Sequence, residues 1–82
     1  MATVSLDSLK LSKVYVLRRG QTLVLDCFPP ISSVRNITLQ PGEFIIVSCD
    51  LSPVRVIVAC QNFRRFRGFR HLESHQRLIV HC

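Results

Sequence analysis

The sequence predicts an all-β domain, a compact sandwich or barrel of six to seven short antiparallel strands. One phrase of three aliphatic residues, one variable residue and a cysteine occurs four times: Leu23–Cys27, Ile45–Cys49, Val56–Cys60 and Leu78–Cys82. The apolar runs are short and rich in Val, Ile, Leu and Thr, and Gly, Pro, Ser and Asp separate them, as is typical of strands and turns. The 82 residues (1–82) suffice for one small domain.

Six segments are expected to be strands, and a weaker seventh lies near the N-terminus. They are Lys13–Leu17, Gln21–Cys27, Val34–Leu39, Glu43–Cys49, Val54–Cys60 and Arg77–Cys82, with Thr3–Leu9 as the weaker one. Pro29 and Pro30 follow a strand because proline cannot donate a hydrogen bond to a sheet. Pro41-Gly42 marks a turn.

The alternation of side chains along a strand predicts which residues form the core. In each phrase the first and third aliphatic residues share a face with the cysteine, and this face is expected to be buried: Leu23, Leu25, Cys27, Ile45, Val47, Cys49, Val56, Val58, Cys60, Leu78, Val80 and Cys82. The opposite face combines polar and apolar residues, and on it the apolar Phe44, Ile46 and Ile57 have no predicted core to pack against. These three residues are the predicted oligomer interface.

The chain also has a rhythm of eleven residues. Units that start at Leu17, Leu39 and Leu72 share this leucine and carry Gln or Glu at the fifth position (Gln21, Glu43 and Gln76). Internal duplication and a plain succession of evenly sized strands both account for this rhythm.

The predicted hairpin Glu43–Cys60, with Asp50–Pro53 as its loop, restricts the disulfides that can form. Cys49 lies beside the loop and Cys60 at the open end, roughly 20 Å away. A disulfide needs Cα atoms within about 7 Å, so a Cys49–Cys60 bond is excluded. In an up-and-down order, Cys27 and Cys49 lie at one end of the sheet, and Cys60 and Cys82 at the other.

The N-terminal segment predicts an intracellular protein, in the cytoplasm or nucleus. Asp7, Lys10 and Lys13 interrupt the apolar stretch that a signal peptide needs, and no apolar run approaches the ~18–20 residues of a membrane-spanning helix. The cysteines are therefore expected to be free thiols. The glycosylation motif Asn36-Ile37-Thr38 would matter only outside the cell, and is treated as a chance match.

The segment Gln61–His71 contains no aliphatic residue and alternates phenylalanine with arginine. The chain has a net charge of +6, which favours polyanionic partners, although codon bias or an overlapping reading frame also raises the arginine content. The leading hypothesis is a non-enzymatic nucleic-acid-binding protein, with RNA preferred over DNA. Arg64, Arg65, Arg67 and Arg70 would contact phosphates, Phe66 or Phe69 would stack on bases, and Arg18, Arg19 and Arg77 would add positive potential.

Three other interpretations of the chain remain open. The phenylalanines of this segment could anchor a loop to the core, or Phe and Arg could dock on an anionic membrane. The rival function is a homo-oligomeric structural or interaction protein, for example a small viral accessory or virion component, that assembles through the interface predicted above.

Metal binding and catalysis have little support in the sequence. His71 and His75 are four residues apart, but no Cys-x-x-Cys pair accompanies them, as structural zinc sites usually require. The acidic residues are scattered singly, and no nucleophile elbow or phosphate-binding glycine loop occurs. We therefore expect no metal, no cofactor and no enzyme activity.

Overall fold

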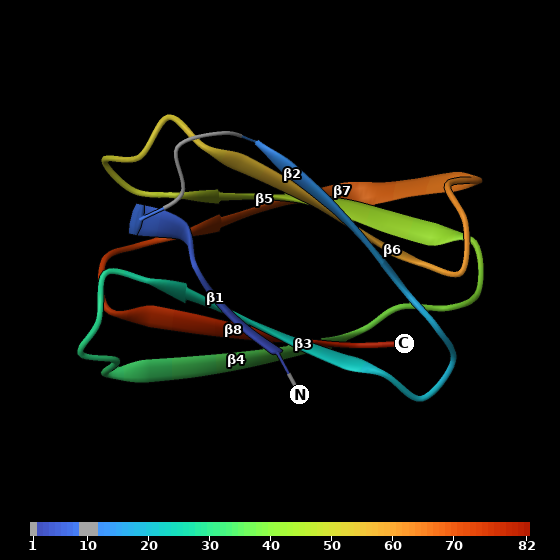
Figure 1. Ribbon diagram of the computed structural model, residues 1–82, viewed down its shortest axis with the longest axis horizontal. Helices are drawn as coiled ribbons and strands as arrows, with labels where there is room; N and C mark the ends of the chain where they lie inside the picture. The colour runs from blue at the N-terminus through green and yellow to red at the C-terminus, as the bar shows by residue number, and fades with distance from the viewer. Residues whose placement is uncertain (1, 9–11) are drawn as a thin grey trace.

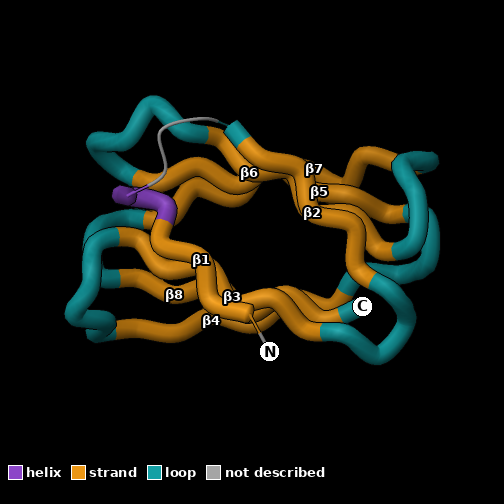
Figure 2. The backbone as a smooth tube through the Cα atoms, viewed as in Figure 1, coloured by secondary structure: helices purple, strands orange, loops and turns teal. Residues whose placement is uncertain are grey.

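The computed structural model describes residues 2–8 and 12–82 and has two stacked four-stranded β-sheets (Figure 1). A single 3-10 turn, Leu6–Ser8, interrupts the strands of the described part. The strands are β1 Ala2–Ser5, β2 Lys13–Leu17, β3 Thr22–Cys27, β4 Ser33–Thr38, β5 Glu43–Cys49, β6 Arg55–Cys60, β7 Arg65–Leu72 and β8 Gln76–His81. The β class is confirmed, as a two-layer arrangement of eight strands that does not close into a barrel (Figure 2).

The expectation of antiparallel sheets is wrong. The order is β1-β3-β8-β4 in one sheet, called sheet A, and β2-β6-β5-β7 in the other, called sheet B. In each sheet the central pair is antiparallel and both outer pairs are parallel. Side chains alternate in the same way in both kinds of pairing, so the sequence pattern does not distinguish them.

The predicted strands agree with the structure to within one or two residues at their ends, except at the N-terminus. There β1 stops at Ser5, and Leu9, the last residue of the expected strand, lies outside the described residues. The predicted hairpin is confirmed, since β5 and β6 pair antiparallel with Phe44 opposite Ala59 and Ser48 opposite Arg55. Strand β7 was not predicted, because its Arg and Phe residues lack the aliphatic pattern used to find the others.

The predicted core face is confirmed. Its members are almost fully buried between the sheets, apart from the partly buried Cys82. Six further described residues complete the core, although they lie outside the repeated phrase: Leu6, Leu17, Ile37, Leu39, Val54 and Leu72. Burial of the fourteen aliphatic side chains of the described core is the main force that holds the two sheets together.

The expectation of free thiols is wrong, because all four cysteines form disulfides. Cys27 is bonded to Cys49 and Cys60 to Cys82, with Cα–Cα distances of 5.5 and 5.2 Å. The predicted grouping at two opposite ends is confirmed, but each bond joins sheet A to sheet B instead of lying within one sheet. Each cysteine lies at the end of a strand, on the side that faces the core. Because the two sheets are stacked, the sulfur atoms meet across the core.

The two halves of the fold are related by an offset of 33 residues, which relates Cys27 to Cys60 and Cys49 to Cys82. The same offset carries β3 onto β6, β4 onto β7 and β5 onto β8. The pairings follow, since β3 pairs antiparallel with β8 as β6 does with β5, and β4 pairs parallel with β8 as β7 does with β5. This internal two-fold relationship supports the duplication that the eleven-residue rhythm suggested.

The residues shared by the repeated units form one kind of turn three times. In Arg18–Gln21, Gln40–Glu43 and Glu73–Gln76, the side-chain oxygen of the last residue accepts a hydrogen bond of 2.7–2.8 Å from the N–H of the first. The third position has a positive φ, which favours glycine and is occupied by Gly20, Gly42 and His75. The recurring Leu and Gln or Glu therefore specify a buried anchor and a turn.

Candidate functional site

The outer side of sheet B carries a continuous apolar surface, here called the apolar face. The strand registers place its side chains in two rows that cross all four strands. One row is Val16, Ala59, Phe44 and Phe66, and the other is Val14, Ile57, Ile46 and Phe69. The predicted interface residues Phe44, Ile46 and Ile57 form its centre.

Most of this face is open to solvent, although Ala59 within it is fully buried. Val14, Val16 and Phe69 are 57%, 50% and 67% exposed, and Phe66 is 43% exposed. Isolated apolar side chains are common on protein surfaces, but a contiguous apolar patch usually marks an interaction site. The sequence prediction missed Val14 and Val16, although their alternation with the inward-facing Tyr15 and Leu17 was a usable signal.

Four phenylalanines form a cluster on this face. The ring centroids of Phe44 lie 5.7 Å from Phe63 and 5.4 Å from Phe66, and Phe66 lies 5.0 Å from Phe69. Edge-to-face and tilted pairs at these distances are favourable. The expectation of a core-anchored loop is therefore not met, because Phe63, Phe66 and Phe69 are exposed and lie outside the core.

The arginines of β7 lie along its free edge. Arg65 and Arg67 both contact Glu43, with N–O distances of 3.5 and 3.4 Å. A β-bulge between β5 and β7 leaves Arg67 without a partner in the register, and its guanidinium reaches the Thr38 carbonyl oxygen of β4. Glu43 thus partly neutralises two of the four predicted phosphate-binding arginines.

A basic groove runs between the edge strands β4 and β7, where the two sheets open. It has a volume of about 380 Å³ and is lined by Arg35, Asn36, Ile37, Thr38, Arg67, Arg70 and Leu78. Arg35 was not among the predicted site residues, because it is a single arginine inside an aliphatic strand. Phe66 and Phe69 belong to the same strand, β7, but their rings lie on the apolar face and do not line the groove.

The other predicted arginines lie elsewhere. Arg18 and Arg19 are exposed in the turn between β2 and β3, and Arg64 precedes β7. Arg77 lies on the outer side of sheet A, where it binds Asp26 through Nε–Oδ1 and Nη2–Oδ2 contacts of 2.7 and 3.1 Å. The hydrogen bond from Arg77 to Asp26 raises the pKa of the guanidinium. The nine predicted nucleic-acid-binding residues therefore do not form one surface.

One polar cluster at the end of β7 has the residue types of an acyl-transfer triad. Ser48 Oγ lies 2.9 Å from His71 Nδ1, and His71 Nε2 lies 3.9 Å from Asp50 Oδ1. The second distance is too long for a hydrogen bond, and the His71 and Asp50 side chains are 58% and 48% exposed. The imidazole is not held in the orientation that would activate a serine nucleophile.

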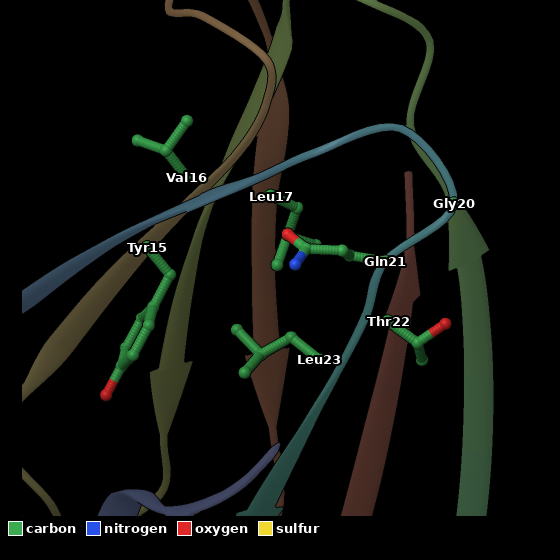
Figure 3. A pocket seen from close by; sticks show the side chains of 7 residues that line it. All are labelled: Tyr15, Val16, Leu17, Gly20, Gln21, Thr22 and Leu23. Atoms are coloured by element: carbon green, nitrogen blue, oxygen red, sulfur yellow. The ribbon is translucent and has the colours of Figure 1, made fainter. Parts of the chain in front are cut away.

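A hollow of about 720 Å³ lies between β2 and β3, on the side of the sandwich opposite β4 and β7. Figure 3 shows Leu17 and Leu23 on one side of β2 and Val16 on the other, which agrees with the place of Val16 on the apolar face. The lining of the hollow holds no charged side chain, and its polar side chains are those of Tyr15, Gln21 and Thr22. Gln21 Oε1 already accepts a hydrogen bond from the Arg18 N–H, and Thr22 Oγ1 lies 3.3 Å from His81 Nδ1.

Residues 2–8 and 12–82 hold neither a cluster of metal ligands nor a helix that could span a membrane. No group of three or more His, Cys, Asp or Glu side chains there could hold a metal ion. In the same residues, no helix is long and apolar enough to cross a membrane. The disulfides leave the cysteines unable to act as zinc ligands.

Comparison of the chain with protein-family models, curated proteins and solved structures finds no match.

Proposed function

We propose that this protein is a non-enzymatic interaction module that self-associates through the apolar face. The observation that carries the proposal is the pair of uninterrupted rows, eight apolar residues across four strands with no charged side chain among them. A sheet with one apolar side normally buries it against another layer. On the inner side of sheet B, sheet A provides that layer, and the outer side has none among the described residues.

A second copy of the chain is the occupant that fits the face best. Sheets stack about 10 Å apart when aliphatic and aromatic side chains interdigitate, and two apolar faces supply such side chains to each other. The charged groups of β7, Arg65 and Arg67, lie at the edge, where they stay hydrated in a face-to-face pair. The centre of the interface then contains no unpaired charge, which would be costly to bury.

The size of the face predicts a weak dimer. Four strands at about 4.8 Å spacing and about 17 Å length cover on the order of 300–400 Å². Two copies would bury roughly 600–800 Å² of projected area, which is below the roughly 1,200 Å² at which stable specific interfaces begin. We therefore expect a concentration-dependent dimer with a dissociation constant on the order of micromolar.

Sedimentation velocity across a concentration series tests the proposal. The variant Val14→Asp/Phe69→Asp places a carboxylate on each of the two edge strands, and we expect it to dimerise at least about tenfold more weakly, a loss of about 1.4 kcal/mol. Its folding should change little, because both side chains are exposed. The matched control is Asn36→Asp on sheet A. A wild-type chain that stays monomeric at about 1 mM, far above the expected dissociation constant, would reject the proposal.

Nucleic-acid binding remains a second candidate, favoured by one observation. Arg67 and Arg70, which line the groove with Arg35, alternate along β7 with the exposed Phe66 and Phe69, and arginine with exposed aromatic rings is the combination that binds single strands without sequence preference. In titrations with single-stranded RNA, the affinity should fall as salt rises, and Arg35→Gln/Arg70→Gln should flatten that slope by about 1.4 units. The same variant should dimerise normally, so the two candidates are separable.

A further inference from the structure

We propose that Asn36 is an acceptor for an N-linked glycan and that the chain folds in an oxidising secretory compartment. Three observations converge: the acceptor motif itself, the exposed position of Asn36 and Thr38 in the edge strand β4, and the two disulfides. Asn36-Ile37-Thr38 is the only Asn-x-Ser/Thr motif in the sequence.

The disulfides change the meaning of the motif. Stable disulfides are typical of secreted and lumenal proteins and rare in the cytosol. All four cysteines are paired, and both bonds lie in the core between the sheets. An acceptor motif in a protein that oxidises its cysteines during folding meets the enzyme that glycosylates asparagine in the same compartment.

The local geometry leaves the reactive atom of Asn36 unused. Its side-chain oxygen Oδ1 lies 3.1 Å from His81 Nε2, and His81 Nδ1 lies 3.3 Å from Thr22 Oγ1. An imidazole protonated on Nε2 donates to Asn36 and accepts from Thr22, which satisfies all three groups. The glycan is joined to Nδ2, and the amide oxygen stays available, so this contact survives the modification.

The position in the fold suits a bulky modification. Asn36 is exposed and points outward from sheet A, beside Ile79 in the register and near the half-exposed Val34. Strand β4 is an edge strand, with β8 on one side only. A glycan there would shield this free edge from pairing with other chains, a hazard that proteins commonly manage on edge strands. Asn36 also lies on the outer side of sheet A, the opposite surface from the apolar face.

The test is secretion of the full chain from mammalian cells behind a cleavable signal peptide, followed by digestion with peptide N-glycosidase. We expect one discrete mobility step that the enzyme removes. The step should disappear in Asn36→Gln and Thr38→Ala and persist in Thr38→Ser, which keeps the motif. The glycosylated chain should retain both disulfides in non-reducing peptide mapping.

Arg64→Thr is the matched positive control, because it creates a second Asn-x-Thr motif, which begins at Asn62 in an exposed loop. We expect two steps in this variant and one in the wild type. A wild-type chain without an enzyme-sensitive step, when the Arg64→Thr chain shows one, would overturn the proposal. A glycosylated wild-type chain that fails to form Cys27–Cys49 and Cys60–Cys82 would overturn it as well.

Discussion

The outer sides of the two sheets are equivalent by the 33-residue offset, yet their chemistry differs. One central pair is apolar in both, since Val24 and Ile79 of sheet A correspond to Ile57 and Ile46 of sheet B, but the neighbouring positions differ. Where sheet B pairs Ala59 with Phe44, sheet A pairs Asp26 with Arg77. Where strand β7 exposes Phe69, strand β4 exposes Asn36. The inner sides, by contrast, both present aliphatic residues and cysteine. The repeated architecture therefore requires only the inner sides to be alike, and the outer sides have diverged into a hydrated surface and an apolar one.

The first test removes the two disulfides that join the sheets. Each disulfide closes a 22-residue separation and is expected to contribute about 3 kcal/mol through the entropy of the unfolded chain. Because a domain of this size has a total stability of roughly 5–10 kcal/mol, reduction of both should unfold it near physiological temperature. Thermal unfolding monitored by circular dichroism, with and without reductant, measures this. An unchanged midpoint after complete reduction would contradict it.

The second test moves the polar pair of sheet A onto sheet B. Ala59 is fully buried, so Ala59→Asp alone should destabilise the fold by about 3 kcal/mol through an unpaired buried carboxylate. The additional substitution Phe44→Arg places an arginine opposite this carboxylate, as Arg77 lies opposite Asp26. We expect it to recover about 1 kcal/mol or more of the lost folding stability. Urea unfolding of both variants gives the difference. A double variant no more stable than the single one would show that the two positions are not equivalent.

The third and smallest effect comes from exchanging single exposed residues between the faces. Phe69→Asn should weaken self-association about tenfold, and its folding stability should change by under about 1 kcal/mol. The reciprocal Asn36→Phe serves as the control, and should leave association through the apolar face unaltered. Equilibrium sedimentation reports both. Equal weakening by the two substitutions would place the interface somewhere other than sheet B.

The sequence predicted the core and most strands because burial imposes a period of two on the aliphatic residues. It did not predict strand β7, because the residues from Arg65 to Arg70 hold their place through hydrogen bonds to β5 and through stacking of Phe66 on Phe44. The sequence pattern also did not predict the parallel pairing, because it does not show which strands are neighbours. Among the neighbouring strands of the two sheets, only β5 and β6 are consecutive along the chain.

The candidate site was predicted in part. The alternation of side chains predicts that Phe44, Ile46 and Ile57 lie on the outer side of their strands, away from the core, and the structure places them together. The phenylalanines of Gln61–His71 were assigned to a separate surface, because nothing in the sequence shows that β7 pairs beside β5. The disulfides were missed because the pairing depends on the stacking of two sheets, which brings Cys27 to Cys49 across the core.

The two disulfides enclose separate stretches of chain, residues 27–49 and 60–82. Closure of the first covalent loop therefore does not require either cysteine of the second. Strand β3, however, needs β8 as its antiparallel neighbour, and β5 needs β6. The first half can thus be closed covalently while its sheets are incomplete, because both layers need strands from the second half.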